Sequence, residues 1–367
     1  MMTLPILIDA HQDLAWNMLS FGRDYRRAAA ETRKLEEDTE VPSHNGQTVL
    51  GWPDYQRAQA AIIFNTLFIA PRRYAEGEWE TQVFSNADES RRLYRAQIDA
   101  YRRLCEQNPD LFRSVRTKRD LEAVLKPWDE APASFPDVTH PVGLVMLIEG
   151  AEGIEDPGEL QEYWQAGVRI IGPVWAGTRF CGAMIEPGEF TRQGYAFLDK
   201  MDELGFILDI SHMNTVSSLQ ALDHYRGPVI ATHANARALL KNAQGERHFT
   251  DATIHSLIER DGVMGVVMYN RFLLPDWTTS DRRSAVTLNK VANQIDYICQ
   301  KAGDALHTGL GTDFDGGFGW PAVPEEIDTI ADLQKLVPIL VERGYQNSDV
   351  SNILGENWRR FLERNLP

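Results

Sequence analysis

Histidine and carboxylate side chains follow several short apolar runs of this sequence, at the points where those runs stop. His11 and Asp13 follow the first run, and Glu149 ends the third. Three further residues follow the fifth, sixth and eighth runs, namely His212, His233 and Asp313. Imidazole and carboxylate donors without thiolates are typical of a divalent transition-metal site, with zinc as the first choice and manganese, cobalt or iron as alternatives.

The size of this set predicts a site for two metal ions. No apolar run ends in a lysine that could join the two ions, which leaves Glu149 as the candidate bridge. Because residues i and i+2 of a strand share a face, His11 and Asp13 would bind one ion together. His212 and His233 would bind the other. Two metals about 3.5–4 Å apart would hold a bridging water, lower its pKa and polarise a carbonyl.

Asp313 is the carboxylate that remains for proton transfer, from the attacking water to the leaving amine. Each residue of the set also has a structural interpretation: Glu149 could cap a helix, and Asp313 or Asp315 could form a turn. A chance placement of all these residues at the ends of apolar runs is less probable than a shared site at one end of the barrel. The other histidines complete no such set and are interpreted as structural: His44, His140, His224, His248, His255 and His307.

The apolar runs themselves predict the elements that position these side chains. Eight runs have the length of strands and are almost continuously apolar, as expected for parallel strands covered on both faces. They comprise residues 6–8, 61–64, 142–148, 168–174, 206–210, 229–231, 263–269 and 308–310. Helical patterns alternate with them at 159–166, 194–204, 216–222, 250–260 and 286–302. The alternation predicts an α/β fold, a (β/α)8 TIM barrel, with a doubly wound open sheet as the alternative.

Two connections are far longer than the few residues usual between a strand and a helix. Residues 14–59 and 70–141 are interpreted as insertions after the first and second strands of one domain that spans 1–367. The second insertion has helical patterns at 86–107 and 117–125, followed by a proline-rich connection at 127–141. Two amphipathic helices, at 330–340 and 348–366, form a C-terminal tail.

Composition excludes several classes of protein. The chain has 367 residues with 37 Lys and Arg against 53 Asp and Glu, a net charge of −16, which argues against nucleic acid or an anionic membrane as the main partner. Three widely spaced cysteines form neither a disulfide framework nor a thiolate metal motif. The sequence shows no signal peptide and no membrane-spanning run, so we expect a cytoplasmic protein.

Several motifs in this order resemble the membrane (renal) dipeptidase family, peptidase family M19, of the amidohydrolase-like metal-dependent hydrolases. The resemblance covers nearly the whole chain and is weakest in the two insertions. It is carried by residues 9–16 (DAHQDLAW), 149–150 (EG), 191–212 (TRQGYAFLDKMDELGFILDISH), 232–237 (THANAR), 311–316 (GTDFDG) and 344–361 (GYQNSDVSNILGENWRRF).

The resemblance implies a metallo-dipeptidase with two zinc ions per chain. Glu149 would bridge the ions, and the ligand set would be His11, Asp13, Glu149, His212 and His233. Asp313 matches the catalytic acid/base of the family, and Arg247 resembles the arginine that receives the C-terminal carboxylate of the dipeptide. Substrates of the family are dipeptides, often with a D-residue at the C-terminal position, and sometimes β-lactams or dehydropeptides. Homodimers are common in the family.

The sequence departs from the family pattern at two positions. Trp175 stands where many members have a histidine that binds the substrate and polarises its carbonyl. An indole can pack against the substrate and donate one hydrogen bond, but it carries no positive charge. Glu152 also stands where many members have histidine, and we expect its carboxylate near the mouth of the barrel to disfavour acidic substrates.

Two alternatives to a dipeptidase remain at this point. The same metal site would also suit a lactonase, a deacylase or a phosphoesterase. A binding protein with weakened catalysis is the second alternative, suggested by Trp175. The presence of Asp313 together with all five metal ligands argues against it.

Overall fold

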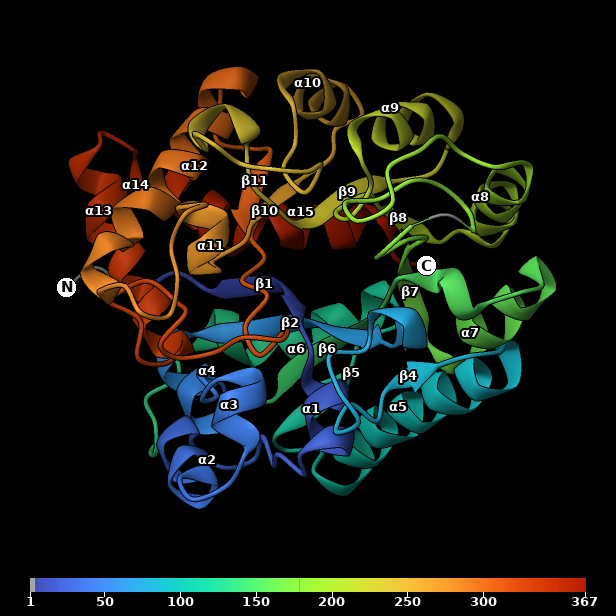
Figure 1. The fold of residues 1–367 in the computed structure, drawn as a ribbon. Helices are drawn as coiled ribbons and strands as arrows, with labels where there is room; N and C mark the ends of the chain where they lie inside the picture. The colour runs from blue at the N-terminus through green and yellow to red at the C-terminus, as the bar shows by residue number, and fades with distance from the viewer. Residues whose placement is uncertain (1–3, 178) are drawn as a thin grey trace.

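The computed structural model describes residues 4–177 and 179–367. Eight parallel strands close into a barrel, because β2 pairs with β1 on one side and with β6 on the other (Figure 1). The strands are β1 (Leu7–Gln12), β2 (Ala60–Phe68), β6 (Val142–Glu149), β7 (Val168–Gly172), β8 (Ile207–Asp209), β9 (Val229–Ala234), β10 (Met264–Val266) and β11 (Thr308–Leu310). The predicted TIM barrel is confirmed, and the alternative prediction of a doubly wound open sheet is wrong.

Continuous apolar sequence forms these strands because both of their faces are covered. All eight residues of β6, from Val142 to Glu149, are buried, with the ring of helices on one face and the barrel interior on the other (Figure 1). A ninth strand, β5 (Phe112–Ser114), pairs with residues 142–144 of β6. It occupies the edge of β6 that β7 does not reach, since β7 pairs only with residues 146–149.

Helices follow the strands as the alternating pattern predicts. They are α7 (Leu160–Ala166), α8 (Arg192–Leu204), α9 (Thr215–His224), α10 (Asp251–Glu259), the short α11 (Asn270–Leu273) and α12 (Leu288–Ala302). Thr191 caps α8 by accepting a hydrogen bond from the backbone N–H of Gly194, and Gly205 ends the helix in a left-handed conformation at φ 82°. Among the described residues, no helix is both long and apolar enough to cross a membrane.

The first insertion forms four short helices beside the barrel, from the lower left to the lower centre of Figure 1. They are α1 (Leu14–Ser20), α2 (Ala29–Glu36), α3 (Val41–Asn45) and α4 (Trp52–Ala58). Asp315, in the loop after β11, attaches this insertion to the barrel. Its buried carboxylate accepts hydrogen bonds from the Arg23 guanidinium at 3.0 Å, the Tyr25 hydroxyl at 2.8 Å and the Thr48 hydroxyl at 2.6 Å.

The second insertion contains β3 (Ala70–Pro71), β4 (Val83–Phe84), α5 (Ala87–Gln107), β5 and α6 (Lys118–Glu130). The prediction that α6 stops before Pro127 is wrong, because the helix continues to Glu130. Packing explains the extension. Trp128 is buried on this last turn, and its indole N–H donates to the carbonyl of Pro141 at 3.0 Å. This tertiary anchor outweighs the cost of the backbone hydrogen bond that proline cannot form.

The C-terminal tail is helical as predicted, but it is more divided than the sequence suggests. A 3-10 segment (Ile330–Lys335) leads into α13 (Leu336–Glu342), and α14 (Asn347–Ser351) passes through a π-helical turn (Asn352–Glu356) into α15 (Asn357–Asn365). Trp358 fixes the tail to the barrel. Its indole N–H donates to the carbonyl of Leu310 in β11 at 3.0 Å, and its ring lies so close to Gly309 that a side chain there would collide with it.

Candidate active site

The barrel brings the six residues of the predicted set into one buried cluster at the carboxyl ends of its strands. They come from five strands or from the loops that directly follow them: His11 and Asp13 (β1), Glu149 (β6), His212 (after β8), His233 (β9) and Asp313 (after β11). All six are at most about a tenth exposed. Parallel strands end on the same rim of a barrel, so residues far apart in the sequence meet there.

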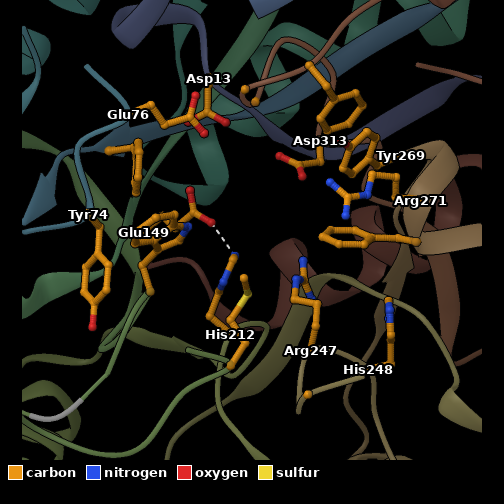
Figure 2. Close-up of a pocket in the computed structure, with 18 of the residues that line it drawn as sticks. Asp13, Tyr74, Glu76, Glu149, His212, Arg247, His248, Tyr269, Arg271 and Asp313 are labelled. Carbon is orange, nitrogen blue, oxygen red and sulfur yellow. Dashed lines mark ion pairs between the residues drawn. The ribbon is translucent and has the colours of Figure 1, made fainter. Parts of the chain in front are cut away.

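Glu149 lies at the centre of the cluster. Its Oε1 atom is 2.6 Å from Nε2 of His212, the pair marked in Figure 2. Oε1 is also 3.4 Å from Nε2 of His233, while Oε2 is 3.4 Å from Nε2 of His11. Nε2 of His11 is also 3.6 Å from the carboxylate of Asp13. The two oxygens of one carboxylate therefore face two groups of donors, the division that a bridging ligand requires.

Hydrogen bonds behind the cluster orient one of its imidazoles. Nδ1 of His233 is 2.9 Å from the hydroxyl of Thr232, and that hydroxyl donates to the buried carboxylate of Asp209 at 2.5 Å. A proton on Nδ1 would be directed to Thr232, which leaves the lone pair of Nε2 facing the cluster. Asp209 also accepts the hydroxyl and backbone N–H of Ser211, so it holds the loop that carries His212.

Asp313 is held beside His11 by an unusual backbone conformation. Its φ is +61°, a left-handed value that aspartate tolerates better than most residues, and its N–H donates to the carbonyl of His11 at 3.1 Å. Oδ1 of Asp313 lies 3.7 Å from Nε2 of His11. Gly316 leaves room for this arrangement, because a side chain there would collide with the carboxylates of Asp313 and Asp13.

The carboxylates of the cluster differ in their proton affinity. Burial raises the pKa of Asp313 well above its usual range, and the neighbouring charges of Asp13 and Glu149 raise it further. Burial also acts to raise the pKa of Glu149, but the facing imidazoles of His11 and His212 outweigh it and hold that pKa well below its usual range. One carboxylate is thus suited to stay ionised and another to carry a proton.

The residues present fit two divalent metal ions. Three groups of potential ligand atoms overlap: His11, Asp13 and Glu149; Glu149, His212 and His233; and His11, His233 and Asp313. Glu149 belongs to the first two groups, which divide the ligands as the sequence predicts. Oδ1 of Asp13 and Nδ1 of His212 are buried without a hydrogen-bond partner among the described residues. Nitrogen and oxygen donors of this kind suit zinc and related transition metals.

A cavity of about 620 Å³ opens over this cluster, a size that suits a small-molecule ligand. Asp13, Glu149, His212 and Asp313 contribute to its floor (Figure 2). Aromatic side chains form much of its wall, among them Trp16, Phe68, Tyr74, Trp79, Tyr269 and Phe318. Charged residues that the sequence did not single out also line it, among them Glu76, Glu80 and Arg271. His44 and His248, which the sequence analysis interpreted as structural, line it as well. They lie in the insertions, in loops and on the short helix α11, where no periodic pattern could mark them.

Arg247 lines the cavity beside the cluster, but its guanidinium also supports the metal-binding loops. One terminal nitrogen donates to the carbonyl of Ser211 and the other to the carbonyl of His233, both at 3.0 Å. The side chain is buried, lies over the ring of Phe272 at 5.0 Å, and has its Nε without a partner among the described residues. Arg247 is therefore a buried charge at the cavity rather than a solvated loop residue.

Trp175 forms part of the cavity wall. Its ring meets those of Phe68 and Tyr74 edge to face, at 5.1 and 6.2 Å between centroids, and lies 6.4 Å from the ring of His212. Glu152, whose carboxylate was expected near the mouth, is buried and does not line this cavity. Its Oε1 accepts the backbone N–H groups of residues 175, 176 and 177, at 2.8, 2.9 and 3.3 Å, so it holds the loop that carries Trp175.

Comparisons with known proteins agree with this geometry. A family model described as membrane dipeptidase (peptidase family M19) matches residues 1–365. The "uncharacterized protein in pqqA 5′ region" of Klebsiella pneumoniae is 32% identical over 232 residues, which cover 60% of this chain and 82% of that protein. An uncharacterized dipeptidase of Schizosaccharomyces pombe is 28% identical over 373 residues, with 98% of this chain and 80% of that protein covered.

Solved structures share the fold. A metallo peptidase from Rhodobacter sphaeroides, liganded with a phosphinate mimic of the dipeptide L-Ala-D-Ala, superposes with a TM-score of 0.78 at 20% identity and covers 99% of this chain and 100% of its own. A structure described as the dipeptidase AC, a metallo peptidase of family M19, has a TM-score of 0.76 at 21% identity, with 99% of each chain covered. The chain belongs to the membrane dipeptidase family, peptidase family M19, and is a metal-dependent dipeptidase of that family.

Proposed function

We propose that this protein hydrolyses dipeptides at a site for two zinc ions, with the ligand set His11, Asp13, Glu149, His212 and His233. The observation that carries the proposal is the position of Glu149, whose two carboxylate oxygens face different groups of donors. Two divalent ions held there would lower the pKa of a water molecule and polarise a substrate carbonyl. The phosphinate dipeptide mimic bound to the Rhodobacter sphaeroides relative supports a dipeptide substrate.

Asp313 would act as the general base and acid of the reaction. It lies in the floor of the cavity, beside His11, and is not needed to complete either half of the ligand set that shares Glu149. A carboxylate whose pKa is raised by burial can accept a proton from an attacking water and then give it to the leaving amine.

Arg247 would bind the C-terminal carboxylate of the dipeptide. Its charge is buried at one side of the cavity, and its Nε is free to donate. Glu76 and Glu80 line the cavity elsewhere, and Figure 2 shows Glu76 on the opposite side from Arg247. A dipeptide with a free amino group at one end and a carboxylate at the other matches this distribution of charge.

Trp175 would contact a substrate side chain rather than polarise the carbonyl. The indole lies against Phe68 and Tyr74 in an apolar wall, and it offers one N–H donor but no charge. We include dipeptides with a D-residue at the C-terminal position among the substrates, because the Rhodobacter sphaeroides relative is liganded with a phosphinate mimic of L-Ala-D-Ala.

Elemental analysis of the purified protein together with a panel of dipeptides tests the proposal. We expect about two zinc ions per chain, as in other two-metal hydrolases, and hydrolysis of L-Xaa–D-Xaa dipeptides. Because Arg247 also holds the loops of His212 and His233, the metal content of Arg247→Ala is measured beside its activity. Where both ions are retained, the variant should lose far more hydrolysis of dipeptides than of simple esters, since only the dipeptide has the carboxylate. Hydrolysis of lactones or esters without any cleavage of dipeptides would assign the same site to a different substrate class.

A further inference from the structure

The cavity contains a second guanidinium on the side where Arg247 lies. Arg271, at the start of α11, lines the same cavity, and Figure 2 shows both arginines on the side opposite Glu76. Arg247 alone offers enough donors for one carboxylate, because a guanidinium can bind both oxygens of such a group. A second guanidinium therefore exceeds what the α-carboxylate of a dipeptide requires.

Arg271 forms no ion pair within the described part of the chain. Arg271 is exposed. Arg247, in contrast, is buried, and both of its terminal nitrogens donate hydrogen bonds to backbone carbonyls. The two arginines are thus in different states: Arg247 is fixed within the fold, while Arg271 keeps its charge available to a ligand. Tyr269, directly before α11, lines the cavity and stacks on Phe318 at 4.4 Å between ring centroids, so an aromatic wall lies on this side.

None of the acidic residues that line the cavity forms an ion pair with Arg271 within the described part of the chain. Glu246 lines the cavity, but its carboxylate accepts hydrogen bonds from the backbone and hydroxyl of Thr215 and lies 3.5 Å from Arg237. Asp276 is exposed and accepts a hydrogen bond from the amide of Asn242 at 3.4 Å. Asp313 lies 3.7 Å from His11 within the cluster.

We propose that Arg271 selects dipeptides whose C-terminal residue carries a second carboxylate, that is aspartate or glutamate. The inference rests on the proposed function, since it assumes that the α-carboxylate binds at Arg247. The side-chain carboxylate would then reach Arg271 at the mouth and form a charge-assisted hydrogen bond with it. A C-terminal residue with a neutral side chain would leave Arg271 in solvent. The binding free energy of such a substrate would neither gain from Arg271 nor be much reduced by it.

Steady-state kinetics of the zinc-loaded enzyme test this specificity. The substrates are pairs of dipeptides with the same N-terminal residue and the same configuration, one ending in alanine and the other in glutamate or aspartate. We expect kcat/KM to be higher for the acidic member of each pair, and Arg271→Gln to lower it about tenfold or more for that member only, mainly through KM. Arg271→Lys keeps the charge and should restore part of the loss.

Arg282→Gln is a matched control, because it removes the same charge from an exposed arginine that does not line the cavity. An equal loss for neutral and acidic dipeptides in Arg271→Gln would overturn the proposal, since Arg271 would then bind a group common to all substrates. Equal rates for both members of each pair in the wild type would also overturn it. Neither result would affect the proposed function, which is tested by the metal content and by the hydrolysis of any dipeptide in the panel.

Discussion

The Nε2 atoms of His212 and His233 lie 2.9 Å apart, and both face Oε1 of the same carboxylate, Glu149. Two imidazole nitrogens at this distance can share only one proton. Nδ1 of His233 is directed to the hydroxyl of Thr232, so its Nε2 lone pair is free to bind a cation. The pair of rings and the carboxylate therefore suit a metal ion better than a network of hydrogen bonds.

Removal of metal should inactivate and destabilise the protein. Without cations, the carboxylates of Asp13, Glu149 and Asp313 stay buried close together and repel one another. We expect treatment with EDTA to abolish dipeptide hydrolysis and lower the Tm, and zinc to restore both. Glu149→Gln should lower the metal content measured by elemental analysis. Full activity of a protein shown to contain no metal would contradict the metal-dependent mechanism.

Asp313→Asn should separate catalysis from metal binding. The amide preserves the size of the side chain but cannot accept and return a proton, and we expect kcat to fall about 10²–10⁴-fold. The metal content should remain that of the wild type, because Glu149 still joins the other ligands. Asp281→Asn, on an exposed turn, is the control and should have normal activity. Normal turnover in Asp313→Asn would assign proton transfer to another group.

Glu152 should act on substrate binding through the loop of Trp175. Glu152→Ala leaves three backbone N–H groups without their acceptor, and we expect a loss of about 2 kcal/mol or more in the free energy of unfolding together with a higher KM. Glu152→Gln keeps an acceptor oxygen and should lie near the wild type in both measurements. An alanine variant with unchanged stability and KM would show that the loop keeps its position without this carboxylate.

Asp315 should be essential for stability although it lies two residues from Asp313. Asp315→Ala would leave the buried guanidinium of Arg23 with Glu36 as its remaining ion-pair partner, and we expect a loss of about 3–5 kcal/mol in urea unfolding. Glu162→Ala breaks the exposed pair with Arg95, which is 2.9 Å long, and should cost no more than about 1 kcal/mol. Equal costs for the two substitutions would contradict the role of Asp315 as an anchor of the first insertion.

His248 should make the protein less stable in acid. Burial, assisted by the charges of Arg247 and Arg237, lowers the pKa of its imidazole to about 3. An unfolded chain would protonate this residue near pH 6.5, so below that pH the unfolded state binds more protons and stability falls by up to about 1.4 kcal/mol per pH unit. His248→Gln should flatten the decline of unfolding free energy between about pH 6 and pH 4. The exposed His255→Gln is the control, and a slope equal to the wild type in His248→Gln would contradict the prediction.

Local patterns in the sequence were sufficient to predict the barrel and the residues at the ends of its strands. A parallel strand covered on both faces must be apolar almost throughout, so each strand is visible in the chain without knowledge of its neighbours. A polar residue that ends such a run lies at the rim, because the carboxyl ends of the parallel strands meet there. His11, Glu149 and His233 were found in this way, although they are far apart in the sequence.

Only the tertiary structure decided what the loop residues do. Asp313 and Asp315 share one short motif, yet one joins the cluster and the other binds Arg23, because closure of the barrel places the first insertion against the second aspartate alone. Glu152 binds backbone N–H groups of the Trp175 loop, and Arg271 meets the cavity from a short helix after β10. These contacts join segments whose spacing in the chain has no period, and the closed barrel, rather than any local preference, sets the distances between them.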